Sequence, residues 1–384
     1  MKKIYQTLGV MSVTFLLASC SNNTQNGSED TVNSDEVVEQ MDEGIESATD
    51  KVEESEDIKD SASADSTVEE NQEHQMTLKL GYGAPHGERS FSAIFVGLEG
   101  DTITNVSIDE FQFMDASENY QGVPNSDTDF GEGYDENQVL ISKVENNEAY
   151  SKLMAEKAAA TNSLVEGYQA ISEFAEGKTI SELEEAIDDL HRVEDPSGIS
   201  DVVSGATLVD TPGYLEEIVR VAKDGFEFST DGVEDIENAE LSYSLQTPHG
   251  SKSFALVGVL HQDDMIIAAI QDELQFMDDA DVEGVPNSDQ AFGEAYHENS
   301  ILISKRANTE SYSELMVDKG NATMTYDENH QAISEFVVGM TVQELQEVID
   351  QLAGKESEET TDTVSGATFA DETGYLEAIL NTIQ

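Results

Sequence analysis

The chain repeats itself once, and this duplication limits what it can fold into more than any other feature. A shift of about 162 residues aligns Met76–Arg220 with Ala239–Leu380. A period of this length is that of a duplicated globular domain and not of a short solenoid repeat. The recurring segments are PHG (Pro85–Gly87 and Pro248–Gly250), QFMD (Gln112–Asp115 and Gln275–Asp278), GVPNSD (Gly122–Asp127 and Gly284–Asp289), ISK (Ile141–Lys143 and Ile303–Lys305) and QAISEF (Gln169–Phe174 and Gln331–Phe336).

Each copy reads as an α+β unit, with the sheet first and the helices later. The opening third, such as SFSAIFVGLEGDTITNVSIDEF in the first copy, alternates apolar and polar residues between Gly and Asp turns, which is typical of antiparallel strands. Later segments such as TVQELQEVIDQL carry apolar residues at helical spacing. Thr179 with Glu182, and Thr341 with Glu344, form capping-box patterns that predict two helix starts.

The N-terminus has the pattern of a bacterial secretion signal. Lys2 and Lys3 precede an apolar run, Leu8–Ala18, which is too short to span a bilayer and ends in LASC. This ending resembles a lipobox, in which cleavage before Cys20 leaves the cysteine to carry diacylglycerol, and usually an N-acyl chain such as palmitate. The alternative is a buried cysteine at the end of an ordinary signal peptide. Cys20 is the single cysteine, so a lipidated Cys20 leaves no thiol for disulfides, metal ligation or catalysis.

Charge excludes several classes of partner. The chain has 81 Asp and Glu against 18 Lys and Arg, a formal net charge of -63, which repels nucleic acid and anionic lipid headgroups. A saline habitat would explain the same acidity without any link to mechanism. Residues 21–75 are acidic, rich in Ser, Asn and Thr, and without an aromatic residue, so we expect a disordered tether. The expected organisation is a signal peptide (1–19), a lipidated cysteine and acidic linker (20–75), a first domain (76–225), a linker (226–238) and a second domain (239–384).

A seven-residue pattern recurs near the end of each copy. DVVSGAT spans Asp201–Thr207 and DTVSGAT spans Asp362–Thr368, and each stands shortly before a helical segment, GYLEEIV or GYLEAIL. Ser, Gly and Thr ahead of a helix favour anion binding, because the unpaired N–H groups and the helix dipole both attract negative charge. A plain helix cap is the alternative for either copy alone. The Asp three residues before SGAT, present at matching places in both copies, favours a shared functional role.

These residues resemble the flavin-attachment motif D-x-x-[ST]-G-A-[ST] of the FMN-binding domain family. The resemblance implies two FMN groups, each joined by a phosphoester bond to the last Thr of its motif and installed by a flavin transferase that uses FAD as donor. Family motifs often continue with Ser or Thr two positions later, where this chain has Val209 and Ala370. The implied attachment residues are Thr207 and Thr368, and the surrounding motif positions are Asp201, Ser204, Gly205, Ala206, Asp362, Ser365, Gly366 and Ala367.

The order of lipobox, acidic tether and two such domains is similar to that of PplA-type lipoproteins of Gram-positive extracellular electron transfer. It implies a protein anchored by lipid to the outer face of the cell membrane, carrying electrons from a quinone-linked membrane donor to extracellular acceptors such as ferric iron. An electron carrier fits better than a substrate-specific enzyme, and no catalytic residue is expected. The alternatives are an accessory electron donor to an extracellular reductase, and a non-redox surface lipoprotein that acts as an adhesin or binds a solute.

Other recurring residues leave their roles open. His86 and His249 suggest either a turn or a place near the flavin, and no histidine spacing suggests a metal site. Glu132 and Glu294 read as solvated loop charges, and Tyr134 and Tyr296 stay undecided. The QFMD and GVPNSD segments fit ordinary core and a turn, or else packing beside an isoalloxazine ring, for which the candidates are Phe113, Met114, Phe276 and Met277.

Overall fold

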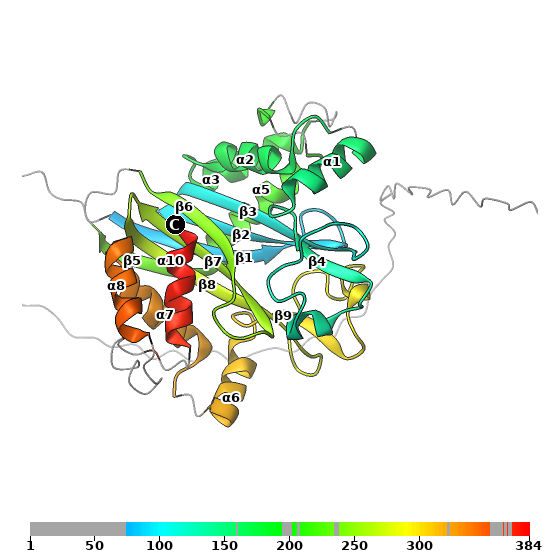
Figure 1. Cartoon of the computed structure of the whole chain (residues 1–384). Helices are drawn as coiled ribbons and strands as arrows, with labels where there is room; N and C mark the ends of the chain where they lie inside the picture. Colours follow the sequence, from blue (N-terminus) through cyan, green and yellow to red (C-terminus); the bar gives the residue numbers. More distant parts are fainter. Residues whose placement is uncertain are drawn as a thin grey trace, which may run out of the picture. The chain divides into compact units, whose positions relative to one another are not determined.

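Each copy of the repeat begins with an antiparallel meander of strands and continues with helices (Figure 1). The computed structural model describes residues 74–158, 160–193, 202–205, 208–233, 238–320, 323–353, 364, 367 and 371–384, all within the compact unit Val68–Gln384. The expected signal peptide, Cys20 and nearly all of the acidic linker lie outside the described residues. The predicted α+β class is confirmed, with two antiparallel sheets and the helices of each copy after its strands.

The first sheet has the strand order β4-β3-β2-β1-β5, and every neighbouring pair is antiparallel. Its fifth strand comes from the segment expected to be a linker, since Phe226–Val233 pairs with β1 at the edge of the sheet. The strands are β1 (His74–Gly83), β2 (Ser90–Glu99), β3 (Thr102–Asp115), β4 (Gln138–Ser142) and β5 (Phe226–Val233).

The second sheet has the order β6-β7-β8-β9 and repeats the meander of the first four strands. Its strands are β6 (Glu240–Gln246), β7 (Ser253–Gln262), β8 (Met265–Asp278) and β9 (Ser300–Ser304).

The α-helices of each copy follow its fourth strand, and a short 3-10 helix precedes that strand. In the first copy they are η1 (Asp129–Gly133), α1 (Asn147–Ala158), α2 (Leu164–Ala175), α3 (Ile180–Leu190) and α5 (Thr211–Asp224). In the second they are η3 (Gly293–Ala295), α6 (Thr309–Gly320), α7 (Tyr326–Val337), α8 (Val342–Leu352) and α10 (Glu372–Thr382). The structure confirms both predicted capping boxes, at Thr179 and Thr341. Within the described part of the chain, no helix combines the length and the apolar character that a membrane span requires.

Strand β2 shows why both faces of the first sheet are buried. Successive side chains of a strand point to opposite faces, and here both sets are apolar. Phe91, Ala93 and Phe95 belong to a core cluster that also contains side chains of the second sheet. Ile94, Val96 and Leu98 belong to another cluster, which α2, α3 and α5 cover. The first sheet is therefore packed between its own helices and the second sheet.

Strand β7 of the second copy repeats this division. Phe254, Leu256 and Leu260 face the cluster that the two sheets share, and Val257 and Val259 face α7, α8 and α10. The described residues thus form four layers: helices, sheet, sheet and helices. Figure 1 shows the green helices of the first copy on one side of the strands and the orange and red helices of the second copy on the other.

Candidate functional site

The first SGAT segment forms an exposed turn on the surface of α2. Ser204 and Gly205 are exposed, while Val203 just before them is fully buried in the core between the first sheet and its helices. Asn162 donates a hydrogen bond from Nδ2 to the Gly205 carbonyl oxygen over 2.8 Å. The predicted site residues Asp201, Ala206 and Thr207 lie outside the described residues.

Small residues let this turn lie close to α2. Gly205 has φ +90°, a conformation that favours glycine, and a Cβ at this position would lie 3.4 Å from the Ala170 Cβ. A Cβ at Gly167 would lie 3.2 Å from the Leu208 side chain, so the glycine gives Leu208 room to pack. The chain then enters α5 at Thr211. One side of the turn therefore packs against α2, and Ser204 and Gly205 are exposed to solvent.

The second motif, Asp362–Thr368, has two described residues. Val364 and Ala367 are both fully buried and belong to the core between the second sheet and its helices. The other predicted site residues of this copy, Asp362, Ser365, Gly366 and Thr368, lie outside the part of the chain that the structure describes. Val364 matches Val203 in the repeat, so the residue before SGAT is buried at the corresponding place in both copies.

The recurring histidines lie next to the two segments. His86 Nδ1 is 2.6 Å from Asp210 Oδ2, and His249 Nδ1 is 2.5 Å from Asp371 Oδ2. Asp210 and Asp371 each stand three residues after the predicted attachment threonine. The hydrogen bond with Asp210 raises the pKa of His86 above its ordinary value. A proton at Nδ1 facing the carboxylate would leave Nε2 to face solvent, since both imidazoles are about half exposed.

Each aspartate occupies the N-cap of its helix without capping it. Among the described residues no side chain caps α5 or α10, because the Asp210 and Asp371 carboxylates bond to the histidines. An N-cap side chain normally satisfies one of the first N–H groups of a helix. The histidines therefore take up the aspartate carboxylates. At the start of α5 Pro212 has no N–H to offer, and the Thr211 N–H donates to the Leu208 carbonyl oxygen.

The PHG turn also packs directly against the start of the helix. A Cβ on Gly213 would lie 3.1 Å from the Pro85 carbonyl oxygen, and one on Gly374 would lie 2.3 Å from the Pro248 carbonyl oxygen. Glycine at these positions permits the approach. Two segments more than a hundred residues apart in sequence, the PHG turn and the start of the helix that follows SGAT, thus meet in each copy.

A buried ion pair lies beneath the helices of each copy. Lys143 pairs with Glu110 and Lys305 with Glu273, and each of these side chains is at most 1% exposed. Tyr214 of α5 donates to Glu110, and Tyr375 of α10 donates to Glu273 over 2.7 Å. These three polar positions recur: the lysines lie in the ISK repeat and the tyrosines in GYLEEIV and GYLEAIL.

Each ion pair also lowers the pKa of its glutamate. Burial alone would raise the pKa of Glu110 and of Glu273, but the neighbouring ammonium groups of Lys143 and Lys305 hold both below their ordinary value. The tyrosines therefore donate to charged carboxylates. The network fixes the first turn of α5 and of α10, the helices that follow the SGAT segments.

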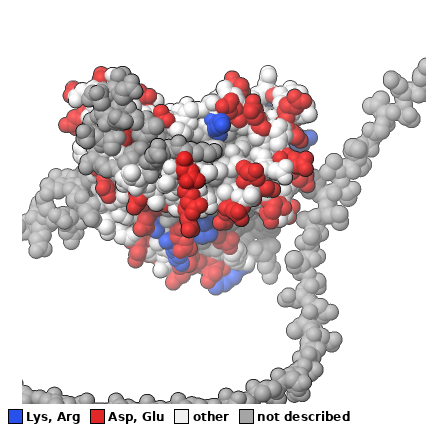
Figure 2. Space-filling view, turned by 90° about the horizontal axis from the view of Figure 1, so that it is seen from below, with Lys and Arg blue, Asp and Glu red and all other residues white. Residues whose placement is uncertain are grey.

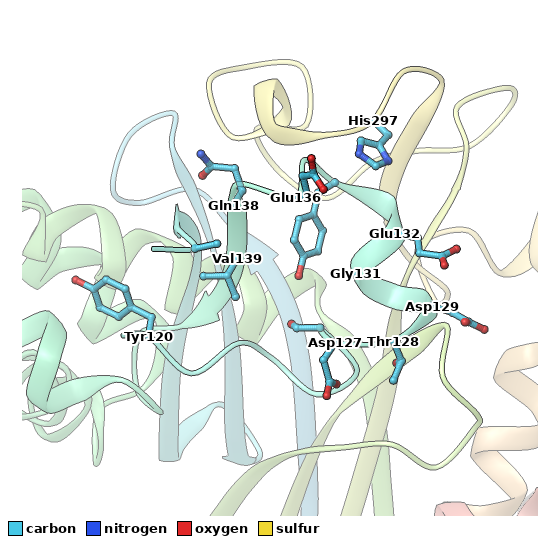
Figure 3. Close-up of a pocket in the computed structure, with 13 residues that line it drawn as sticks. Tyr120, Asp127, Thr128, Asp129, Gly131, Glu132, Glu136, Gln138, Val139 and His297 are labelled. Carbon is cyan, nitrogen blue, oxygen red and sulfur yellow. The ribbon is translucent and has the colours of Figure 1, made fainter. Parts of the chain in front are cut away.

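A further pocket lies away from the SGAT segments. It has a volume of about 650 Å³ and is lined by the GVPNSD and FGE segments of the first copy and by His297 of the second. Figure 3 shows Asp127, Thr128 and Asp129 on one side, Gln138 and Val139 on another, and His297 on a separate loop. Glu132 lines this pocket, and none of the described lining residues belongs to an SGAT segment.

The QFMD phenylalanines pack between the two copies. Phe113 contacts Tyr134, Phe292 and Tyr296, with ring centroids 5.0, 5.0 and 6.1 Å away. Phe276 contacts Phe130, Tyr134 and Tyr296 in the corresponding way. The structure supports the interpretation of these two residues as core residues. The core they pack against contains side chains of both sheets. Tyr134 and Tyr296 also pair with each other as an isolated β-bridge.

The described residues fit a phosphoester-linked nucleotide. The exposed Ser204–Gly205 turn is accessible to a second protein, and His86, whose pKa the hydrogen bond with Asp210 raises, can supply positive charge near the start of α5. Comparison of the chain with family models, with curated proteins and with solved structures finds no match.

Proposed function

We propose that this protein is a lipid-anchored extracellular flavoprotein that carries electrons through two FMN groups bound covalently at Thr207 and Thr368. One observation carries the proposal: in both copies the SGAT segment leads into a helix whose N-cap aspartate holds the histidine of a PHG turn. A simple helix cap requires neither the histidine nor its recurrence.

Attachment is a group transfer from FAD. The Thr oxygen forms a bond to the phosphorus of the FMN half, the pyrophosphate bond breaks, AMP leaves, and the hydroxyl proton passes to a base of the transferase or to water. The transferase must reach the acceptor from outside, and the exposure of Ser204 and Gly205 is consistent with such access. The product is a phosphodiester with one negative charge, in a chain that already carries a net charge of -63.

The chain's own residues orient the site and balance this charge. The isoalloxazine supplies one- and two-electron chemistry when it is bound. His86 and His249 place a partly exposed imidazole at the start of the helix that follows each motif, and protonation of His86, which the Asp210 carboxylate favours, provides a cation for a phosphate. Asn162 holds the Gly205 carbonyl and so fixes the shape of the first turn.

The acidic surface is consistent with cationic acceptors. Figure 2 shows one face of the molecule, on which Asp and Glu dominate and Lys and Arg are few. Such a field attracts ferric ions and repels anionic headgroups, which keeps the folded unit away from the membrane to which Cys20 is attached. Electrons enter from a membrane donor linked to quinone and leave to the extracellular acceptor.

The test is expression of the mature chain with a flavin transferase, followed by mass spectrometry of the denatured protein. We expect two FMN groups per chain that survive denaturation, and reduction followed by reoxidation with a ferric complex. A chain without covalent flavin would refute the proposal, and a flavinylated chain that ferric complexes cannot reoxidise would refute the carrier role.

A further inference from the structure

The two copies exchange reciprocal hydrogen bonds through their GVPNSD and PHG segments. Asn287 of the second copy donates from Nδ2 to the Gly87 and Ser90 carbonyl oxygens of the first, both over 2.7 Å. Asn125 of the first copy donates to the Gly250 and Ser253 carbonyl oxygens of the second, over 2.9 and 2.7 Å. Each asparagine thus holds the turn between the first two strands of the other copy.

The backbone explains why asparagine occupies this place. Asn125 and Asn287 have φ of 64° and 67°, in the left-handed region that Asn tolerates better than most residues. This conformation lets a short side chain reach two carbonyl groups of the opposite turn. The Asn in GVPNSD therefore serves a contact between copies as well as a local turn.

Backbone and ring contacts add to the hydrogen bonds of each asparagine, and together we call these contacts a clamp. The Phe292 N–H donates to the Glu88 carbonyl oxygen over 2.8 Å, and the Phe130 N–H donates to the Ser251 carbonyl oxygen over 2.9 Å. The Phe292 ring meets Phe91 edge-on at 5.2 Å. The loop of one copy therefore binds the turn of the other through main chain, amide and aromatic groups together.

The turn that each asparagine holds also carries the histidine that bonds to Asp210 or Asp371. Gly87, which Asn287 holds, directly follows His86, and His86 bonds to Asp210, three residues after Thr207. In the other direction Asn125 holds Gly250, which follows His249, the partner of Asp371. A continuous series of contacts thus leads from each asparagine to the aspartate that stands three residues after the proposed attachment threonine of the opposite copy.

We propose that the histidine–aspartate pair beside each proposed attachment site is positioned by the other copy of the repeat, with Asn287 a positioning residue for His86 and Asn125 for His249, and through them for attachment at Thr207 and Thr368. This inference depends on the proposed function for the identity of the modification. It gives the duplication a purpose, because a single copy would leave the PHG turn of its own site without its clamp. Removal of one asparagine should therefore impair attachment in the opposite copy and leave attachment in its own copy unchanged.

The experiment compares Asn287→Gly with Asn125→Gly in the full chain, flavinylated by the transferase with FAD. Glycine tolerates the left-handed backbone and removes the CH2–CONH2 side chain that makes the two hydrogen bonds. Peptide mass spectrometry follows FMN at each site over time. We expect Asn287→Gly to slow incorporation at Thr207 on the order of fivefold, about the loss of one net hydrogen bond, with Thr368 unchanged. Asn125→Gly is the matched control and should give the reverse pattern.

Three results would overturn the inference: equal slowing at both sites, slowing confined to the variant's own copy, or no slowing at either site. A second readout needs no flavin. In ¹H–¹⁵N spectra of the imidazoles, Asn287→Gly should shift the His86 signals and leave His249 in place, and Asn125→Gly should do the opposite. If the wild type takes up no flavin, the proposed function fails, and these spectra alone decide whether the clamps act across the copies.

Discussion

Asp109 and Glu110 are adjacent on β3 and face opposite layers. Glu110 lies under the helices of its own copy and pairs with Lys143. Asp109 faces the other sheet, where it accepts a hydrogen bond from Tyr243 of the second copy over 3.2 Å. Asp272 repeats this role and accepts from Tyr82 of the first copy over 2.7 Å. Of these two neighbouring carboxylates, Glu110 thus forms the ion pair under the helices of its own copy, and Asp109 forms a contact with the other copy.

The two aspartates predict how stability depends on pH. Burial raises the pKa of both Asp109 and Asp272 from 3.8 to about 6, although several hydrogen bonds oppose the shift. The folded state therefore holds protons that the unfolded chain has released, so the free energy of unfolding falls as pH rises from about 4 to about 6. The loss is on the order of 3 kcal/mol for each carboxyl, from 1.36 kcal/mol per pKa unit.

We expect the double variant Asp109→Asn, Asp272→Asn to lose this dependence, because Asn mimics the protonated acid. The measurement is the free energy of urea unfolding between pH 4 and pH 7 for both proteins. The other carboxylates also repel one another less at low pH, so the difference between variant and wild type is the quantity to compare. Parallel curves would show that the two buried carboxyls do not titrate in this range.

At the scale of single elements, the capping boxes are the clearest link between sequence and structure. In α3 and α8 the threonine side chain accepts from the backbone N–H of the third helical residue, and the glutamate there accepts from the threonine N–H. Both patterns are visible in the sequence because the contacts are local. The structure adds the same motif at Ser163 and Thr325, which start α2 and α7.

Thr179→Ala and Thr341→Ala should each lower the free energy of unfolding by about 1 kcal/mol, through loss of an N-cap hydrogen bond. Urea denaturation measures both, and Thr→Ser at the same positions is the control that keeps the hydroxyl. A Thr→Ala variant as stable as its Ser counterpart would mean that these caps do not contribute.

Long-range pairing is what the sequence could not show. Alternation along SFSAIFVG identifies a strand, but it does not say that both faces are buried or against which elements. The segment 226–238 is expected from the sequence to be a linker. In the structure Phe226–Val233 forms β5, and Phe228 is buried in the core between the sheets. The SGAT pattern located a candidate site, while the contact of Asn162 with Gly205 and that of His86 with Asp210 required the fold.

At the scale of the whole described unit, the two copies share one core. Phe254 is fully buried and its ring lies 5.9 Å from Phe111 and 5.1 Å from Phe130, both of the first copy. Contacts of this kind couple the folding of the two sheets. We therefore expect both copies to unfold in a single cooperative transition.

Phe254→Ala tests this coupling. Loss of a fully buried phenylalanine should cost about 3–5 kcal/mol, and hydrogen exchange should quicken in the first sheet as well as in the second. Val257→Ala is the matched control, because its side chain faces only the helices of its own copy. Protection lost in the second copy alone would show that the copies are stable independently.

The most direct test of the central claim is the intact mass of the flavinylated chain and its acceptor variants after denaturation. We predict two FMN groups on the wild type, one on Thr207→Ala, one on Thr368→Ala and none on the double variant. Peptide mapping should place the remaining group on the intact threonine in each single variant. Covalent flavin retained by the double variant, or none on the wild type, would contradict the account.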